Sequence, residues 1–578
     1  MSFFAAALAA ACQFPKPADR DPDASPDAPT DAPVDAPPDR VAGRFFWVYA
    51  TEAEPVEVPI DLSTTSVSVL VPEAGELRPI IGVGRADGTY QVDGVPPDVA
   101  FFIKVGRDPD WTSARNLTDR SILQYRHDAA MATQPTPVTF NGELPAYASG
   151  DVLDVRSHLA QVEHAILLTP GDTSFSATVD WQEITAQRSL LPVAARGDDL
   201  SIVQLRTTPA SDVDDPEVQQ VLAAAILDGQ TIVDGSPITV DATLTAPTAS
   251  FKFGTSINRD LLEDANTFSA RPAGITVTCA AVPSLVSRRG GPRIFLPIVR
   301  VAKFNWRETD VRTLSVTGTF PDPYRPSWPR MCRLDYSRSR AFRYRDGSIG
   351  RFSASGSRYS IPNLLDRALP PPRDVRIDGR DLDWGGMLTA NAPHELTWVG
   401  SAAANSYEIT IFSHLPGGLR RYHIIIATAQ PSLTIYPEFL AGVERVSIEV
   451  RAISAPSDFA AGEHTPWGVP SSEGSFLSAL FRVSSTCGDG QLDVGEDCDA
   501  RGESATCDVD CTAVTCGDGL RNPTAGELCD PVEDAVNCDA DCTPAVCGDG
   551  YRNTATEACD DGGTAPGDGC SPTCRVES

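Results

Sequence analysis

The sequence predicts a mostly β protein, a multidomain string of antiparallel β-sandwiches followed by C-terminal disulfide-rich repeats. At 578 residues the chain is too long for a single hydrophobic core, and roughly four domains are expected. Short β-branched or alternating runs, separated by Gly and Pro turns, recur from Arg44 to Val483. Beyond them, 12 of the 15 cysteines fall into a pattern that occurs three times at intervals of about 30 residues.

The N-terminal segment, residues 1–12, predicts a membrane anchor. Phe3 to Ala11 are small or apolar and lead directly into Cys12, the one cysteine left over if the other fourteen pair. This segment resembles a bacterial lipoprotein signal, which implies lipidation of Cys12 after cleavage, although no Lys or Arg precedes it. The alternative is an apolar terminus with a chance cysteine. No other apolar run reaches the roughly 18 residues of a membrane helix, so membrane attachment is expected through lipid only.

Residues 13–40 predict a disordered linker. The stretch repeats Pro-Asp-Ala and Asp-Ala-Pro and has almost no large apolar side chain, so burial cannot offset its chain entropy. Proline and like charges keep such a chain extended. We expect a tether between the lipid anchor and the first folded domain; a tail without a role would have the same composition.

The next two regions predict β-sandwiches with no catalytic signature. Residues 41–111 contain short strand-like runs, and the stretch from Ala86 to Val105 resembles the prealbumin-like, carboxypeptidase-regulatory sandwich, which implies a scaffold. Residues 112–370 form a β-rich region of one or two domains. One helix is expected there, because Asp215 suits an N-cap, Pro216 suits the first helical position and Gly229 suits the end. Five apolar residues recur on one face of that helix: Val218, Val221, Leu222, Ala225 and Ile226.

Residues 371–485 predict a more regular sandwich. Apolar side chains alternate cleanly along the run from Val446 to Ala452, as in a strand with one buried face. With Trp398 in the second strand and Tyr407 opening the third, the region resembles a fibronectin type III domain. It departs from that family at the sixth strand, where Val446 stands in place of a corner tyrosine. The alternative is a generic seven-stranded sandwich.

Residues 486–578 hold three cysteine-rich repeats, each of which opens with Cys-Gly-Asp-Gly, passes through a Cys-Asp pair and closes on two cysteines. Their cysteines are Cys487, Cys498, Cys507 and Cys511; Cys516, Cys529, Cys538 and Cys542; Cys547, Cys559, Cys570 and Cys574. Four cysteines per unit can pair in three ways. The units resemble the short cysteine-rich repeats of myxobacterial surface proteins, which implies export and disulfide bonding without an activity. Because each unit has few apolar residues, cross-links must replace a core.

Metal binding is a competing use of these residues. Zinc would need free thiolates, which an exported chain does not keep. Calcium would use the carboxylates beside the glycine turns, although their spacing is not that of an EF-hand and solvated acidic surface is the ordinary explanation. We therefore expect no resident cofactor, with Ca²⁺ in the repeats as the alternative. The carboxylates concerned are Asp489, Glu496, Asp499, Asp518, Glu527, Asp530, Asp549, Glu557, Asp560 and Asp568.

Charge is distributed unevenly along the chain. The formal net charge is −31, which makes nucleic acid an improbable partner for the whole protein. The segment from Arg288 to Arg358, however, contains 16 basic residues and only 5 acidic ones, with aromatic residues interleaved among them. A hairpin is expected at Asp346-Gly347. Cys279 and Cys332 are expected to form a disulfide at its base. Candidate binding residues for an acidic polysaccharide or another polyanion are Arg300, Lys303, Trp306, Arg340, Arg343, Tyr344 and Arg345. The alternative is that these cations neutralise the acidic repeats or the acidic linker of the same molecule, or simply solubilise a sheet.

No metalloprotease, serine hydrolase or phosphate-binding motif occurs, so no catalytic residue is proposed from the sequence. The interpretation is a non-enzymatic surface or secreted lipoprotein of the bacterial envelope, acting in adhesion or in binding of polysaccharide or protein. Two alternatives stay open. One is an exported enzyme or enzyme accessory with its site within residues 112–370, and the other is a structural spacer that displays the repeats.

Overall fold

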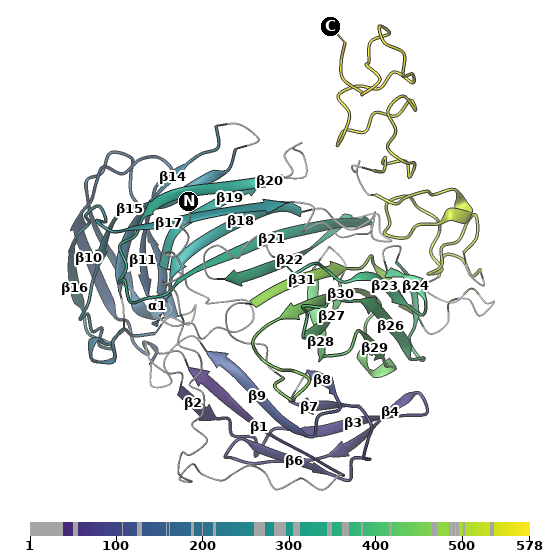
Figure 1. The fold of residues 1–578 in the computed structure, drawn as a ribbon, viewed down its shortest axis with the longest axis horizontal. Coiled ribbons are helices and arrows are strands. Elements are labelled where there is room, and N and C mark those ends of the chain that lie inside the picture. Colours follow the sequence, from purple (N-terminus) through teal and green to yellow (C-terminus); the bar gives the residue numbers. More distant parts are fainter. Residues whose placement is uncertain are drawn as a thin grey trace, which may run out of the picture.

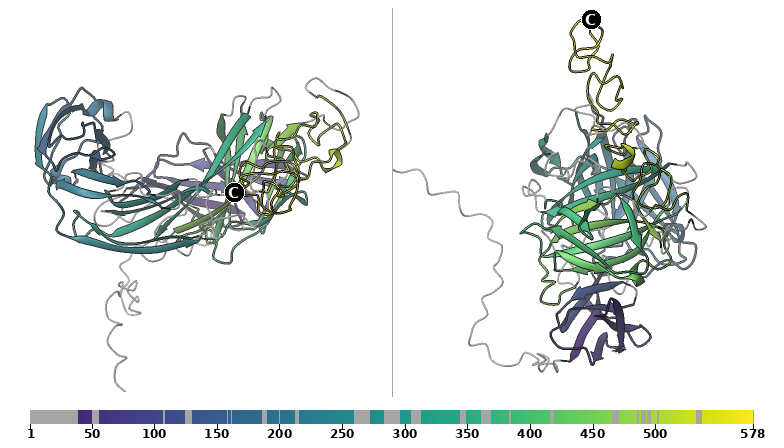
Figure 2. Two further views of the ribbon diagram at one scale, coloured as in Figure 1. Left: turned by 90° about the horizontal axis from the view of Figure 1, so that it is seen from above. Right: turned by 90° about the vertical axis from the view of Figure 1, so that its right-hand side faces the viewer.

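The computed structural model has the predicted mostly β architecture, with many antiparallel sheets and almost no helix. It describes residues 39–577 apart from internal gaps, the longest of which are 50–55, 124–129, 259–271, 283–295, 305–312, 361–368 and 465–470. Four sandwich cores form a curved body, and the repeats project from it beside the fourth sandwich (Figures 1 and 2). Among the described residues, no helix has the length and hydropathy needed to cross a membrane.

The first sandwich packs two sheets around a core that includes Val69, Tyr90 and Phe101. One sheet has the order β2-β1-β6-β5, with β9 pairing parallel to β1, and the other has the order β4-β3-β7-β8. Leu117 of β9 belongs to this core, so the packed unit extends past residue 111. The strands are β1 (Arg40–Tyr49), β2 (Val56–Pro59), β3 (Val67–Glu73), β4 (Glu76–Ile81), β5 (Val83–Gly84), β6 (Thr89–Asp93), β7 (Phe101–Val105), β8 (Pro109–Thr112) and β9 (Asn116–Leu123).

The second and third sandwiches share a sheet. One face of β14 buries Ile202 against the sheet β13-β10-β16, and its other face buries Val203 and Leu205 in the core that includes the sheet β17-β20. The elements are β10 (Pro137–Glu143), β11 (Val152–Ser157), β12 (Val162–Ile166), β13 (Ser174–Asp180), α1 (Trp181–Thr185), η1 (Ala194–Arg196), β14 (Ser201–Thr208), β15 (Glu217–Ile226), β16 (Ile238–Thr243), β17 (Ser250–Asn258), β18 (Pro272–Ala281), β19 (Leu296–Phe304), β20 (Thr313–Pro321), β21 (Arg330–Arg343) and β22 (Ile349–Ser360).

The helix predicted after Asp215 is wrong, because that stretch is strand β15. It pairs with β14 on one side and with β19 on the other, with a bulge at Leu222. Beyond the bulge, Ala223 faces the second core and Ala224 faces the third. A strand that buries both faces has no polar alternation, and its continuous apolar run matched a helical period by chance. Backbone pairing on both sides overrides the local helix preference of three alanines.

The fourth sandwich, for which the sequence predicts a fibronectin type III-like domain, packs two sheets face to face. One sheet is β24-β23-β26-β29, and the facing sheet contains β28-β27-β30-β31. Trp398 and Tyr407 pack edge to face with ring centroids 5.2 Å apart, and Val446, Ile448, Val450 and Ala452 are fully buried. The elements are β23 (Arg373–Ile377), β24 (Arg380–Asp381), β25 (Gly386–Thr389), β26 (His394–Val399), β27 (Ser406–His414), β28 (Arg420–Thr428), β29 (Ser432–Ile435), η5 (Pro437–Phe439), β30 (Arg445–Ser454), β31 (Ser471–Leu477) and β32 (Phe481–Ser484).

A continuous ladder of paired strands runs through all four sandwiches. Its order is β12-β11-β14-β15-β19-β18-β21-β22-β31-β30-β27-β28-β8-β7-β3-β4. The long hairpin β21–β22 reaches β31 of the fourth sandwich, and β28 pairs in parallel with β8 of the first (Figure 1). Phe102 of β7 also packs against Phe439, with ring centroids 5.0 Å apart. The sandwiches are therefore joined by strand pairing and by packing of core side chains.

Each C-terminal repeat is held by two nested disulfides, which pair the first cysteine with the fourth and the second with the third. The bonds are Cys487–Cys511 and Cys498–Cys507, Cys516–Cys542 and Cys529–Cys538, and Cys547–Cys574 and Cys559–Cys570. A seventh disulfide joins Cys279 of β18 to Cys332 of β21, which lie directly opposite each other in the ladder. The described repeats contain one short helical turn, η6 (Pro523–Ala525), and isolated bridges.

Candidate functional site

The Cys-Gly-Asp-Gly turn and the Cys-Asp pair that recur in the repeats are explained by hydrogen bonds from backbone amides to the aspartate. In the second repeat, the carboxylate of Asp530 accepts from the backbone amides of Gly517 and Gly519, the glycines of Cys-Gly-Asp-Gly. In the third, Asp560 accepts from the amides of Gly550 and Gly562 at 3.0 and 2.8 Å, and these hydrogen bonds lower its pKa. The acidic residue after the second cysteine thus satisfies the donors of a glycine turn that has no strand partner.

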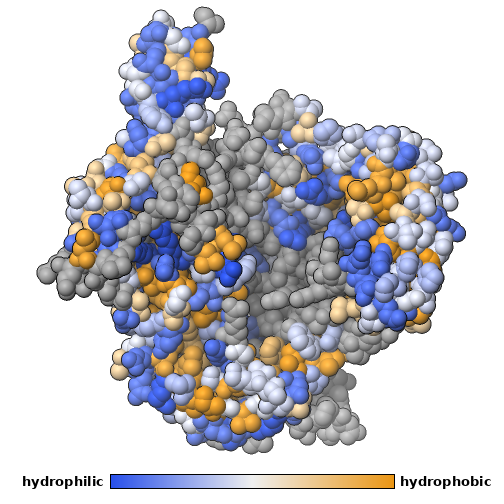
Figure 3. Space-filling view, turned by 180° about the vertical axis from the view of Figure 1, so that it is seen from behind, coloured by the Kyte–Doolittle hydropathy of each residue, from blue (hydrophilic) through white to orange (hydrophobic). Residues whose placement is uncertain are grey.

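Neighbouring repeats are joined by an asparagine. Asn522 of the second repeat donates from Nδ2 to the Asp508 Oδ1 of the first at 2.9 Å, and Asn553 donates to Asp539 at 2.8 Å in the same way. The Glu527 carboxylate accepts from the backbone amide of Asn522. Both asparagines are buried. The surface of the projecting repeats is predominantly hydrophilic (Figure 3). This is expected of small units that are stabilised by disulfides and not by a large apolar core.

These contacts bear on the calcium alternative. Glu527, Asp530, Glu557 and Asp560 each accept at least one backbone hydrogen bond, which gives them a structural role. Three clusters join such carboxylates to cysteine sulfurs, but every sulfur in them belongs to a disulfide and cannot act as a thiolate ligand. Asp489 lies outside the described residues, whereas Glu496, Asp499, Asp549 and Asp568 lie within them.

Four arginines of the basic segment form ion pairs with carboxylates of the same region. Arg300 on β19 lies 3.8 Å from Glu217, measured between Nη1 and Oε1, and Lys303 is 2 % exposed. Further ion pairs join Arg325 to Asp228, Arg330 to Asp322 and Arg333 to Asp335. These acidic partners come from strands and loops of the same region. These described arginines are therefore paired with carboxylates of their own region, and none of these pairs involves the repeats that the alternative named.

The interleaved aromatic residues of this segment are in the core. Phe320, Tyr324, Trp328 and Tyr336 are all at most 8 % exposed and belong to the third sandwich core. The predicted hairpin is present as β21–β22. Residues Trp306, Tyr344 and Arg345, together with the side chains of Arg340 and Arg343, lie outside the part of the chain that the structure describes. The described side chains thus do not form the basic-aromatic surface that the sequence predicted.

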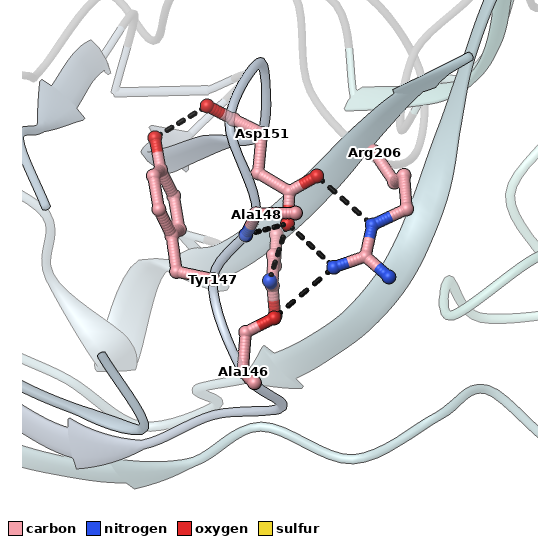
Figure 4. A network of polar contacts seen from close by, with 6 residues as sticks. Ala146, Tyr147, Ala148, Asp151 and Arg206 are labelled. Carbon is pink, nitrogen blue, oxygen red and sulfur yellow. Dashed lines mark hydrogen bonds and ion pairs between the residues drawn. The ribbon is translucent and has the colours of Figure 1, made fainter. Parts of the chain in front are cut away.

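A charged contact fixes the loop between β10 and β11 (Figure 4). The Asp151 carboxylate is buried and accepts from Arg206 Nε at 2.9 Å, from Gln204 Nε2 at 2.9 Å and from the backbone amide of Ala148 at 3.0 Å. Tyr147 donates its hydroxyl to the Asp151 backbone carbonyl. Although burial raises the pKa of Asp151, the hydrogen bonds from Arg206, Ala148 and Gln204 outweigh it and hold the pKa below its ordinary value.

A second charge cluster lies on the face of β30 that points away from the fourth core. Arg451 on β30 lies 2.8 Å from Glu449, 3.5 Å from Glu473 and 3.8 Å from Glu408. Glu449 and Glu473 are buried, so the arginine is the counter-ion of carboxylates from three neighbouring strands of the ladder. Its role is structural, since buried carboxylates need a paired cation.

The outer face of the sheet β13-β10-β16 is largely polar, with Pro137 at one end of β10, and is the best-defined candidate surface. Alternate residues point into the second core, including Val138, Phe140 and Val240. Their neighbours, which define the polar face, are Thr139, Asn141, Glu143, Ser174, Ser176, Thr178, Thr239, Asp241 and Thr243. Antiparallel and parallel pairing place them side by side in register. None of the nine is basic or apolar.

Hydrogen bonds pre-organise the polar face. Asn141 donates from Nδ2 to Asp241 Oδ1 at 3.1 Å and accepts from the Ser176 hydroxyl at 2.8 Å. A shallow groove of about 280 Å³ lies here, lined by Asn141, Gly142, Glu143, Asp241, Ala242 and Thr243. A Cβ on Gly142 would lie 2.1 Å from the Ala242 carbonyl oxygen, so glycine is required for the close approach of β10 and β16. No sequence motif indicates this face, because isolated Ser and Thr residues in short strands carry no functional signature.

Comparisons with known proteins give distant structural similarity alone. No family model matches the chain, and no curated protein matches it. A tetra-tandem repeat from the extending region of a large adhesion protein is 13 % identical, with 77 % of this chain and 100 % of that one covered and a TM-score of 0.10. A Ca²⁺-stabilised adhesin with which an Antarctic bacterium binds ice is 12 % identical, with coverages of 77 % and 99 % and a TM-score of 0.12.

The FN1–FN3 domains of chicken CNTN1 are 12 % identical, with 61 % of this chain and 96 % of theirs covered and a TM-score of 0.11. Scores this low carry no argument about fold or function. The seven disulfides of the described chain are characteristic of a protein that matures in an oxidising compartment. The chain is therefore a disulfide-bonded, extracellular or envelope protein built of β-domains.

Proposed function

We propose that this protein is a non-enzymatic adhesion or binding protein of the bacterial envelope, and that its ligand is a hydroxyl-rich polysaccharide bound on the polar face. The observation that carries the proposal is the set of nine outward side chains on β13, β10 and β16, all hydroxyl, amide or carboxylate. Such groups both donate and accept hydrogen bonds, as sugar hydroxyls require. The resemblance of the repeats to those of myxobacterial surface proteins is consistent with this setting.

The chemistry of the polar face favours a neutral glycan over an acidic one. Its two carboxylates, Glu143 and Asp241, would repel a polyanion, and the described arginines of the basic segment are already paired. The sheet that carries this face packs through the second core on β11, β12 and β14 of the ladder, which would hold it in a fixed orientation relative to the first and fourth sandwiches. A rigid body of this kind suits presentation of a binding surface away from a membrane anchor.

The test is a glycan array and titration with the full-length chain and three variants. Asn141→Ala and Asp241→Ala remove the hydrogen-bonded pair of the groove, and Glu395→Ala removes an exposed carboxylate on β26 of the fourth sandwich as the matched control. We expect at least a tenfold loss of affinity, about 1.4 kcal/mol, for the first two variants and no change for the control. Retention of every glycan by Asn141→Ala and Asp241→Ala would remove the polar face as the binding surface.

A second candidate function rests on the same groove. Two carboxylates beside a sugar are the usual requirement for glycoside hydrolysis, and Glu143 and Asp241 both line the groove. This keeps the alternative of an exported enzyme within residues 112–370. One measurement distinguishes the two functions, namely the release of reducing ends from a bound glycan. An adhesin retains the glycan intact, whereas an enzyme releases product, and Glu143→Gln would then abolish release while binding persists.

A further inference from the structure

His394, the first residue of β26, has a hydrogen-bond acceptor at each of its ring nitrogens. Nδ1 lies 2.6 Å from Oδ2 of Asp378, in the turn between β23 and β24, and Nε2 lies 2.9 Å from the backbone carbonyl oxygen of Thr389 at the end of β25. The histidine is 5 % exposed, so solvent has little access to the ring. A neutral imidazole has one N–H donor, whereas these two acceptors need two.

The arrangement therefore holds one proton more than a neutral imidazole and an ionised carboxylate carry together. The Thr389 carbonyl can only accept, which places a proton on Nε2 and leaves a second proton between Nδ1 and Asp378. The carboxyl group is fixed in this position, because its Oδ1 accepts from the backbone amide of Glu395 at 2.9 Å. Without the second proton, lone pairs would face each other at one of the two ring contacts, and that contact would be lost.

Asp378 is the titratable side chain that contacts the ring among the described residues. β25, the loop from Ala390 to Pro393 and β29 contain no titratable residue. Glu395 follows His394 on the strand, so its side chain points to the opposite face. The other charged or titratable residues of the neighbouring elements are Arg373, Asp374 and Arg376 of β23, Arg380 and Asp381 of β24, Tyr436 and Glu438 at η5, and Glu73 and Glu76 beside the β3–β4 turn that approaches Pro393.

The Thr389 carbonyl connects this pair to the base of the repeats. The carbonyl of Thr389 and the amide of Ala390 belong to one planar peptide group, so a ring that holds the first also fixes the second. The Ala390 amide donates to the Ser484 carbonyl at 2.9 Å, and β25 pairs in parallel with β32. The amide of Cys487, the first cysteine of the repeats, donates to the Ser484 hydroxyl oxygen at 3.2 Å.

We propose that Asp378 and His394 form a proton-dependent latch that holds the end of β25 on β32 and thereby fixes the base of the repeats. While the second proton is present, both ring contacts form. When it leaves as the pH rises, the remaining N–H donates to the carboxylate, because a hydrogen bond to a charged acceptor is the stronger of the two. The Nε2 lone pair then faces the Thr389 carbonyl, and the end of β25 loosens.

The experiment is hydrogen–deuterium exchange of the full-length chain at pH 6 and pH 8.5, on either side of the range in which a histidine changes charge. Rates are corrected for the intrinsic pH dependence of amide exchange. In wild type, peptides that contain Ala390 and Cys487 should exchange at least about tenfold faster at pH 8.5 than at pH 6. His394→Ala removes both ring contacts, so these peptides should exchange fast at both pH values.

Asp378→Asn separates a proton-dependent latch from a merely structural contact. The introduced amide donates to an unprotonated Nδ1, its oxygen still accepts from the Glu395 amide, and Nε2–H still donates to Thr389, so no extra proton is needed. This variant should stay protected at both pH values. The matched control is Asp374→Asn, because Asp374 is exposed and has a positive φ of 48°, close to the 50° of Asp378. It should behave as wild type.

Two results would overturn the proposal. The first is wild-type protection at Ala390 and Cys487 that is equal at pH 6 and pH 8.5. The second is an Asp378→Asn variant with the same pH dependence as wild type, which would assign the change to other groups. If His394→Ala does not fold, the comparison of wild type with Asp378→Asn still decides. Intact mass spectrometry verifies that the introduced amide, which precedes Gly379, has not been hydrolysed.

Discussion

Cys279 and Cys332 are cross-strand neighbours, joined by a disulfide with their Cα atoms 4.0 Å apart on β18 and β21. Both are fully buried in the third sandwich core, and the bond closes a loop with a sequence separation of 53 residues. It lies on the continuous ladder, two strands from β31 of the fourth sandwich. The bond therefore reinforces the part of the ladder that connects the third sandwich to the fourth.

Replacing both cysteines by alanine should lower the free energy of unfolding of the third sandwich by about 4 kcal/mol, from the entropy of the opened loop. Differential scanning calorimetry of the double variant measures this loss. The control is wild type treated with a reductant too mild to open buried disulfides. An unchanged melting transition of the third sandwich would show that the sheet pairing alone accounts for its stability.

The Asp151–Arg206 contact predicts an acid-sensitive second sandwich. Because the folded pKa of Asp151 is depressed, its contribution to stability is present above the ordinary carboxyl pKa and is lost as the pH falls through the lower folded value, below about pH 4. Asp151→Asn should cost about 2 kcal/mol at neutral pH, since it removes charge-assisted hydrogen bonds from a partly exposed arginine. Denaturant unfolding at pH 7 and pH 3 checks this.

At pH 3 the difference between wild type and Asp151→Asn should shrink. A suitable control is Asp172→Asn, because Asp172 accepts from the backbone amide of Thr169 in the same domain without an arginine partner. A gap between wild type and Asp151→Asn that is equal at both pH values would contradict the assignment of a depressed pKa.

Arg451 predicts a large penalty for removal of one buried cation. Arg451→Met keeps most of the side-chain volume but leaves Glu449 and Glu473 buried without their counter-ion, so we expect a loss of about 3–5 kcal/mol in the fourth sandwich. The triple variant that also carries Glu449→Gln and Glu473→Gln should recover part of this loss. Thermal unfolding of the full chain measures both, and a triple variant no more stable than Arg451→Met would show that charge burial is not the cause.

Lipidation of Cys12 stays a prediction, because residues 1–38 lie outside the described part of the chain. In a bacterial host that processes lipoproteins, the full chain should incorporate radiolabelled fatty acid and partition into detergent, whereas Cys12→Ala should do neither. Ser2→Ala, which leaves the apolar run and Cys12 intact, is the matched control. Equal labelling of wild type and Cys12→Ala would exclude lipid at this position.

Most individual strands were predictable because their local patterns are strong. The run from Val446 to Ala452 alternates apolar and polar residues, and all four predicted inward residues are fully buried. The repeated cysteines likewise predicted a disulfide-rich tail. Strand β15 was not predictable, since a strand between two cores loses the alternation that identifies strands. Four aromatic residues of the basic segment, among them Trp328, lie in the core because sequence proximity to arginine does not distinguish core from solvent. The predicted binding residues Trp306 and Tyr344 lie outside the described part of the chain.

The sequence by itself determined the β class, the disulfide-rich C-terminal tail and the oxidising compartment, because these depend on composition, local periodicity and cysteine spacing. Only the tertiary structure decided which of three disulfide pairings each repeat adopts, since that depends on where turns such as Gly517 to Gly519 bring the sulfurs. It also decided that the modules share sheets and a continuous ladder. Strand pairing between residues as distant as Asp110 and Ala427 is a long-range contact that no local pattern encodes.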